Sequence, residues 1–185
     1  MSKEHFDKID DEALVLKIVE TNNQHLFGIL YDRYSNKIYN KCLGFVEDYN
    51  EAQDMTHDIF LKLYVKLKSF KGESKFSTWV YSFTYNFCIN HIQRKYKKED
   101  KLYNEDVSNE IIEDIDDKDI YELKIEKLNQ SIKQLNVEDK TILLMKYQDD
   151  FSIKDIANTL EIGESATKMR LNRAKSRLIN LYNSL

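Results

Sequence analysis

The chain has 185 residues, of which 42% are hydrophobic, with four glycines, no proline and two cysteines, so it is neither collagen-like, nor Gly/Pro-rich and disordered, nor a disulfide scaffold. Its formal net charge is −4, from 28 basic and 32 acidic side chains, which argues against a uniformly basic nucleic-acid binder. No apolar run approaches the roughly 20 residues of a membrane-spanning helix, and the N-terminus lacks the layout of a secretion signal, so we expect a cytoplasmic protein without membrane insertion.

The N-terminal part is expected to be helical. Apolar residues recur at helical spacing over residues 10–19 and 25–45, and again after a cap at Asp48 or Asn50. These apolar positions are Leu14, Ile18, Leu26, Ile29, Leu30, Tyr34, Ile38 and Cys42, followed on the third helix by Ala52, Met55, Ile59, Phe60, Leu63 and Leu67. We expect Cys42 and Cys88 to be core thiols.

The segment after a loop at residues 69–77 has two interpretations. Residues 81–87 alternate aromatic and polar side chains with the period of a strand, which is typical of an aromatic platform for RNA. Against a strand, Ser77 offers a helix cap, and polar residues recur at helical spacing at Ser82, Asn86 and Asn90. No other segment supplies strand partners, and a solitary strand leaves its backbone unsatisfied, so we predict a helix.

Charge is segregated along the chain. Residues 62–98 carry nine basic and one acidic side chain, residues 99–122 carry two basic and eleven acidic, and residues 163–185 carry five basic and one acidic. The acidic stretch has weak periodicity and is typical of a linker between packed units. Because local clusters of cations set the field that a polyanion meets, the basic segments are candidates for two phosphate-contacting surfaces. The alternative explanation is that they are solvated helix faces.

Four helices are predicted after the linker, over residues 123–135, 137–147, 152–160 and 164–182. Asn136 and Ser152 are suitable caps, and Asp155 follows Ser152 at capping-box spacing. Only residues 161–163 separate the last two helices, which is the layout of a helix-turn-helix, whose second helix enters the major groove of DNA. The apolar side of this second helix is expected to contain Ala166, Leu171, Ala174, Leu178 and Leu181. The side expected to face the groove contains Ser165, Lys168, Met169, Asn172 and Arg173. Three further cations are expected to contact phosphates: Arg170, Lys175 and Arg177.

This last helix resembles the final helix of the extracytoplasmic-function (ECF) sigma factors of the sigma-70 family. The similarity over GESATKMRLNRAKSRL lies in Lys168, Arg170, Leu171, Arg173, Ala174 and Leu178, with departures at Ser165, Ala166, Thr167 and Met169. Glu161 stands in the turn where glycine is usual, which predicts mild backbone strain. The resemblance implies binding of the promoter −35 element by Ser165, Thr167, Lys168, Met169, Arg170, Asn172, Arg173 and Arg177.

Residues 50–64, NEAQDMTHDIFLKLY, resemble the family's helix that docks on the clamp of the RNA polymerase largest subunit. The similarity lies in Ala52, Asp54, Phe60, Leu61 and Leu63, and His57 stands where glutamine is usual. Asp54 and Asp58 are one helical turn apart, so they form an acidic face around Leu61 that can pair with basic residues of a partner. The expected polymerase-binding residues are Glu51, Asp54, His57, Asp58 and Leu61.

The stretch FKGESKFSTWVYSFTYNFCINHIQRKYKK closely resembles the family's segment that contacts the promoter −10 element and holds the non-template strand open. Its cations suit phosphates, and its loop and helix groups suit a flipped base. Ser82 stands where the family often has arginine, and Asn90 stands where it often has aspartate. The resemblance therefore does not specify which base is read. Trp79, Tyr81, Phe83 and Phe87 are expected to be mainly structural. The expected −10 residues are Phe70, Lys71, Gly72, Glu73, Ser74, Lys75, Phe76, Ser82, Asn86, Asn90, Arg94 and Lys97.

An enzyme is the first alternative, because Asp54, His57 and Asp58 include a His-Asp dipeptide of the kind found in metal phosphohydrolases. A second inward Glu-x-x-His helix is absent, and His5, His25 and His91 have no ligand spacing. We therefore predict no catalytic residue, no metal and no cofactor.

We predict an all-α protein of two small domains, residues 1–98 and 123–185, joined by an acidic linker at 99–122. The resemblance implies a sigma factor that directs RNA polymerase core to promoters and aids promoter opening. Its implied contacts on polymerase are the clamp of the largest subunit and the flap of the second subunit. The resemblance also makes the protein a candidate for control by an anti-sigma factor. The linker is a candidate mimic of nucleic acid in a polymerase channel. The second alternative is a helix-turn-helix regulator that binds duplex DNA without polymerase, which leaves residues 50–64 and 70–81 unexplained.

Overall fold

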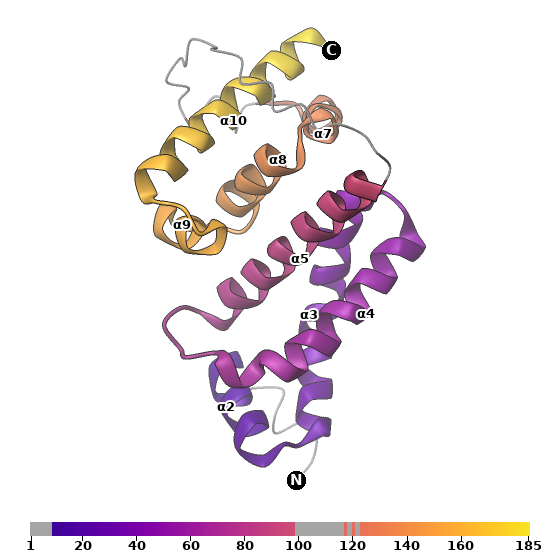
Figure 1. Ribbon diagram of the computed structural model, residues 1–185, viewed down its shortest axis with the longest axis vertical. Coiled ribbons are helices and arrows are strands. Elements are labelled where there is room, and N and C mark those ends of the chain that lie inside the picture. The colour runs from indigo at the N-terminus through magenta and orange to yellow at the C-terminus, as the bar shows by residue number, and fades with distance from the viewer. Residues whose placement is uncertain (1–8, 99–116, 118–119, 121–122) are drawn as a thin grey trace. The chain divides into compact units, whose positions relative to one another are not determined.

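The computed structural model describes residues 9–98, 117, 120 and 123–185, and every regular element among them is a helix (Figure 1). The all-α prediction is therefore confirmed, and no strand occurs in these residues. The chain divides into two compact units, Met1–Ile92 and Gln93–Leu185. Within this described part, no helix is both long enough and apolar enough to span a membrane.

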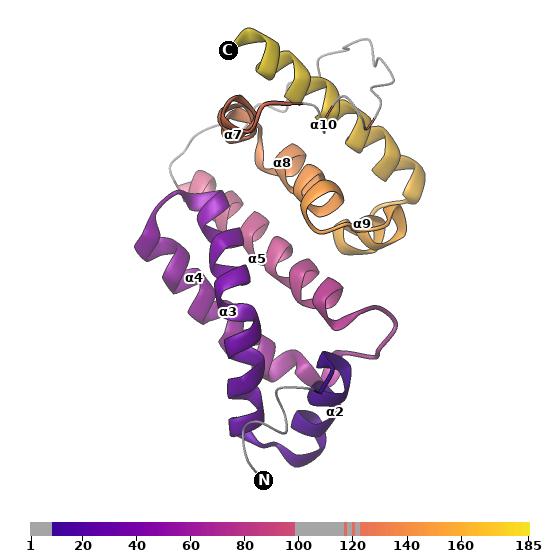
Figure 2. The ribbon, with the colours of Figure 1, turned by 180° about the vertical axis from the view of Figure 1, so that it is seen from behind.

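The described residues of the first unit form helices α2 (Asp11–Thr21), α3 (Gln24–Val46), α4 (Tyr49–Lys66) and most of α5 (Phe76–Lys98), with a 3₁₀ turn η1 (Leu67–Ser69) after α4 (Figure 1 and Figure 2). The residues of α5 from Gln93 onward belong to the second unit. Asp10, Asn23 and Asp48 cap α2, α3 and α4 by accepting hydrogen bonds from backbone N–H groups. Of the two candidate caps for α4, Asp48 is the one used, since its Oδ1 accepts from Glu51 N at 2.8 Å.

The core of the first unit contains every apolar position that helical spacing predicted in residues 10–67. Its largest fully buried side chains include Leu14, Ile38, Ile59, Leu63, Leu67, Phe76 and Tyr85. Burial of apolar surface is the main favourable contribution to folding, so this shared face fixes how α4 and α5 are presented. Cys42 and Cys88 are both buried free thiols, as expected. Their hydrogen bond and burial raise the pKa of the Cys88 thiol.

Residues 76–98 form the predicted helix, because the buried positions of α5 recur at helical spacing. They are Phe76, Val80, Thr84, Tyr85, Cys88 and Ile92. The prediction that Ser77 caps this helix is wrong, since α5 begins at Phe76 and Ser77 lies inside it. The backbone N–H of Phe76 instead donates to Oε1 of Glu12 on α2 at 2.7 Å. A side chain distant in sequence thus satisfies an N–H group that an isolated helix leaves unpaired.

The described residues of the second unit form α7 (Ile125–Gln134), α8 (Val137–Leu143), a π-helical turn η2 (Leu144–Gln148), α9 (Ile153–Leu160) and α10 (Glu164–Ser184). The predicted caps are confirmed: Asn136 caps α8, and Ser152 forms a complete capping box with Asp155 at α9. Helix α10 packs against α7, α8 and α9. Its buried stripe is Thr167, Leu171, Ala174, Lys175, Ser176 and Leu178.

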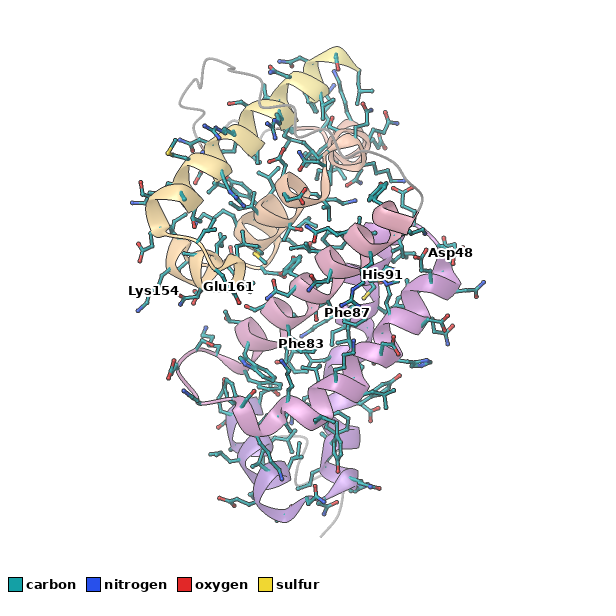
Figure 3. All side chains as sticks on the ribbon, in the orientation of Figure 1. Asp48, Phe83, Phe87, His91, Lys154 and Glu161 are labelled. Atoms are coloured by element: carbon teal, nitrogen blue, oxygen red, sulfur yellow. The ribbon has the colours of Figure 1, made fainter. Side chains whose placement is uncertain are left out.

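The turn between α9 and α10 contains the strain expected at Glu161. This residue lies at the end of α9 (Figure 3) and has φ 55°, in the left-handed region where a side chain with a Cβ costs roughly 1–2 kcal/mol. Ile162 N donates to Ala157 O at 3.0 Å and closes the turn. The predicted helix-turn-helix is confirmed in geometry, with α10 as its second helix.

Candidate functional site

The outward face of α4 carries the residues expected to contact polymerase. Asp54, His57, Asp58 and Leu61 are all exposed, whereas the residues between them belong to the buried face of the helix. Leu61 is 69% exposed. An exposed leucine one helical turn after Asp58 can place apolar surface next to negative charge on a partner.

The same face extends beyond the expected residues. Val65, one helical turn after Leu61, is 77% exposed. Its place on this face was not predicted from the sequence. The signal for Val65 was its spacing of four residues from Leu61, which places both side chains on one side of a helix.

Glu51 differs from the expectation for this face. Its Oε1 lies 2.8 Å from Nε2 of His91 on α5, and its side chain is 23% exposed. His91 and Phe87 lie along the same helix (Figure 3), with ring centroids 6.4 Å apart. Glu51 is therefore engaged in joining α4 to α5, and its expected contact with polymerase stays a prediction.

The loop at residues 70–75 projects four of its expected DNA contacts into solvent. Lys71, Gly72, Glu73 and Lys75 are exposed, and Ser74 is half-buried. Gly72 has φ 73°, a left-handed conformation that glycine adopts without steric cost. The two lysines thus flank a tight bend and are available to phosphates.

The two phenylalanines of this loop segment are held inward. Phe76 is fully buried, so its assignment as a DNA contact is wrong. Its apolar ring packs at 5.2 Å from that of Phe70 and 5.7 Å from that of Trp79. Phe70 is half-buried and also lies 5.6 Å from Trp79. This cluster anchors the loop and leaves its polar tip outward.

Along α5, the expected polar stripe is largely exposed. Asn86, Asn90 and Arg94 are open to solvent, and Ser82 is half-buried with its Oγ donating to Thr78 O at 2.8 Å. The side chain of Lys97 lies outside the described part of the structure. Two amides and a guanidinium therefore follow one another at helical spacing, a suitable array for base edges and phosphates.

Aromatic residues form a second line on α5. Trp79, Phe83 and Phe87 are half-buried and spaced one turn apart, in keeping with the structural role expected for them. Figure 3 shows Phe83 and Phe87 along α5. Two lysines of α4 cover this line: Lys62 Nζ lies 4.6 Å from the centre of the Phe87 ring and Lys66 Nζ 5.9 Å from that of Phe83. These cation–π contacts were not predicted from the sequence.

The outward side of α10 presents most of the residues expected to face DNA. Ser165, Lys168, Met169, Arg170 and Arg173 are exposed, and Asn172 is half-buried. Two neighbouring assignments are wrong. Thr167 is fully buried and its hydroxyl donates to Gly163 O at 3.1 Å, whereas Ala166, expected on the apolar side, is exposed.

Two cations of α10 that were expected to contact phosphates are engaged within the second unit. Arg177 Nη1 lies 2.5 Å from Oδ2 of Asp139 on α8. Lys175 is buried, and its Nζ lies 3.0 Å from Oδ1 of Asp117. The Tyr147 hydroxyl and Lys175 lower the pKa of the Asp117 carboxyl through hydrogen bonds. These ion pairs engage both side chains within the second unit, leaving Lys168, Arg170 and Arg173 as the exposed cations of the expected set.

Among the described residues, no group of three His, Cys, Asp or Glu side chains is arranged to hold a metal ion. His57 and the two aspartates beside it are spread along one exposed helix face, where nothing encloses an ion.

Comparison with known proteins shows that the helices carrying these surfaces fall within two matched family regions. Residues 30–98 match the family model "Sigma-70 region 2", and residues 125–178 match "Sigma-70, region 4". The chain is 28% identical over 174 residues to the ECF RNA polymerase sigma factor SigW of Bacillus subtilis, covering 88% of this chain and 92% of that protein. It is 26% identical over 183 residues to the ECF RNA polymerase sigma-E factor of Haemophilus influenzae, covering 94% of this chain and 96% of that protein.

The chain belongs to the ECF sigma factors of the sigma-70 family. As an ECF sigma factor it directs RNA polymerase to promoters and is not an enzyme. The family identity confirms the functional prediction and excludes the phosphohydrolase alternative.

Solved structures support the fold of this sigma factor. The structure of CnrH in complex with the cytosolic domain of CnrY aligns with TM-score 0.64 and 16% identity over 94% of this chain and 97% of that one. The sigma factor RpoE from Bartonella quintana, in complex with the anti-sigma factor NepR, aligns with TM-score 0.61 and 18% identity over 85% of this chain and 96% of that one. In the present sigma factor the region 2 match begins within α3, so α2 lies outside it.

Proposed function

We propose that this ECF sigma factor uses three separate surfaces, one for polymerase and two for the promoter. The observation that carries the proposal is the segregation of exposed side chains. The α4 face carries carboxylates with Leu61 and Val65, whereas the loop 71–75, α5 and α10 carry exposed cations and amides. Opposite chemistry on different elements supports different partners.

The α4 face is the proposed contact with the clamp of the polymerase largest subunit. Asp54 and Asp58 supply charge for basic residues on the clamp, and Leu61 and Val65 supply apolar surface on the turns that follow them. Electrostatic complementarity mainly sets the specificity and rate of docking, while a buried apolar anchor supplies affinity.

The loop 71–75 and the outward side of α5 are the proposed contact with the −10 element. Lys71, Lys75 and Arg94 suit phosphates of the opened strand, and Asn86 and Asn90 suit base edges. The anchored ring of Phe70 keeps the loop tip outward.

Helix α10 is the proposed −35 contact. Lys168, Arg170 and Arg173 share the exposed side with Ser165 and Met169, and an α-helix of this kind fits the major groove. Thr167, Lys175 and Arg177 are left out of the proposed contact set because they face the interior of the second unit or its ion pairs.

Two further partners belong to the proposal. The flap of the polymerase second subunit is proposed as a contact of the second unit. An anti-sigma factor is proposed as an inhibitor that covers the exposed apolar side chains of α4, since the sigma factor RpoE from Bartonella quintana, which has the same fold, is in complex with the anti-sigma factor NepR. Working with polymerase, the protein is proposed to act in the cytoplasm.

In vitro transcription tests the proposal. Core polymerase and this protein, with no other sigma factor, are expected to initiate at a promoter mapped from transcript start sites after overexpression. Asp54→Lys should abolish initiation by preventing assembly with core, while Arg173→Ala should leave assembly intact and weaken promoter binding. A duplex-binding regulator that acts without polymerase gives no transcript under these conditions.

A further inference from the structure

The start of α5 is held by a residue outside the two matched regions. Glu12 lies on α2, and its Oε1 accepts a hydrogen bond from Phe76 N at 2.7 Å in a partly buried position. The first N–H groups of a helix have no partner within the helix, and a carboxylate there both accepts the bond and complements the positive end of the helix dipole. Glu12 therefore acts as the N-terminal cap of α5 from another helix.

Phe76 directly follows the 70–75 loop, and its side chain packs against the residue at the beginning of that loop. Its fully buried ring contacts Phe70, at the beginning of the loop, with centroids 5.2 Å apart. The same ring lies edge-on to Tyr34 of α3 at 5.6 Å. A shift of Phe76 would therefore move the closing contact of the loop together with the first turn of α5.

The start of α2, which carries Glu12, is held against α3 by hydrogen bonds. Asp11, the neighbour of Glu12, accepts from Arg33 Nη1 at 2.6 Å and also from the Tyr34 hydroxyl. Burial and the hydrogen bond to Asp11 raise the pKa of Tyr34, so this hydroxyl remains a donor. The two acidic residues at the start of α2 thus hold α3 and α5 at the same time, and both views place α2 beside the loop leading into α5 (Figure 1 and Figure 2).

We propose that Glu12 is a positioning residue for recognition of the −10 strand, holding the loop 70–75 and the first turn of α5 in the orientation that binds DNA. The inference rests on the proposed −10 role of that loop. Glu12 itself contacts no DNA in this proposal and acts through the backbone of Phe76.

Substitutions that separate reach from charge test the role of Glu12. Glu12→Gln keeps an oxygen at the same reach but removes the charge, whereas Glu12→Asp keeps the charge on a side chain one methylene shorter. Glu12→Ala removes both, and Glu20→Ala, an exposed glutamate of the same helix, is the matched control. Each full-length variant is assembled with core polymerase and titrated with a single-stranded DNA carrying the mapped −10 sequence.

We expect Glu12→Ala and Glu12→Asp to weaken binding of this single strand about fivefold, the scale of one lost helix cap. Glu12→Gln, which loses only the interaction of the charge with the helix dipole, should bind more tightly than Glu12→Ala, and Glu20→Ala should bind like the unaltered protein. Affinity for core polymerase and for a −35 duplex should stay constant in all four variants. The fluorescence of Trp79, the single tryptophan of the chain, should change with Glu12→Ala and Glu12→Asp alone, because its ring packs on Phe76.

Three results would overturn the inference: unchanged single-strand binding by Glu12→Ala and Glu12→Asp, an equal loss in Glu12→Gln, or a parallel loss of core-polymerase binding. The combined variant Lys71→Ala with Asn86→Ala tests the proposed −10 surface separately. If that variant binds the strand normally, the proposed function of the loop and α5 fails. If it binds weakly while the Glu12 variants bind normally, the role of Glu12 alone fails.

Discussion

Arg177 of α10 and Asp139 of α8 form an ion pair in which Nη1 lies 2.5 Å from Oδ2. Their side chains are 30% and 9% exposed, so the pair is partly withdrawn from water. The same carboxylate oxygen accepts from Nδ2 of Asn136, the cap of α8, at 2.9 Å. This arginine therefore links the C-terminal half of α10 to the beginning of α8.

Replacing Arg177 with alanine is expected to lower the stability of the second unit and to leave its binding of a −35 duplex nearly unchanged. The loss of a charge-assisted hydrogen bond that leaves a nearly buried carboxylate should cost about 2 kcal/mol. Hydrogen exchange of α8 and α10 amides in the full-length protein measures this cost. Arg170→Ala is the control, because its exposed side chain should affect −35 duplex binding and leave exchange unchanged. The reverse pattern would return Arg177 to the DNA surface.

Thr167 and Arg173 should also behave in opposite ways. Thr167→Val removes a buried hydroxyl that donates to Gly163 O but keeps the shape of the side chain, so duplex binding should stay close to that of the unaltered protein while the unit loses some stability. Arg173→Ala should weaken binding of a −35 duplex by about 1–3 kcal/mol with core-polymerase binding near normal. Fluorescence titration with a labelled −35 duplex measures the duplex binding of both variants. Equal loss of duplex and polymerase binding by Arg173→Ala would contradict the division of surfaces.

The helices themselves were predictable from sequence, because apolar residues keep a regular period over long stretches. The predicted face of α10 was less exact at its first turn, where Ala166 and Thr167 are adjacent. A threonine is both polar and β-branched, so the pattern alone does not decide whether it faces DNA or the core. The structure decides in favour of the stripe that contains Thr167, Leu171, Ala174 and Leu178.

Tertiary partners were not predictable in the same way. Arg177 meets an acid 38 residues away, Lys175 one 58 residues away, and Glu12 caps a helix 64 residues away. The sequence identifies each of these as a charged residue near a helix end or on a basic helix. Only the fold brings the opposite group within hydrogen-bond distance, so the sequence overestimated the number of cations available to DNA.

Asp117 provides a prediction for pH. Hydrogen bonds from the Tyr147 hydroxyl, at 2.6 Å, and from Lys175 lower the pKa of this carboxyl below its ordinary value of 3.8. Because the folded-state pKa is the lower one, the stabilisation is complete above about the ordinary value and is lost as pH falls through the folded-state pKa. Carboxyl NMR titration of the full-length protein should show a midpoint below 3.8, and Tyr147→Phe should move it upward. A midpoint at or above that value would contradict the contact.

The exposed apolar surface of α4 gives the sharpest test of polymerase docking. Leu61→Asp changes a side chain that is 69% exposed, so its effect on folding should stay within about 0.5 kcal/mol. If Leu61 is covered by the clamp, the added charge should weaken binding to core polymerase at least about tenfold, or about 1.4 kcal/mol. Leu16→Asp is a matched control, since Leu16 is 61% exposed on α2 and outside the proposed contact. Co-elution and titration with core polymerase measure both variants, and an equal response of the two leucines would contradict docking through α4.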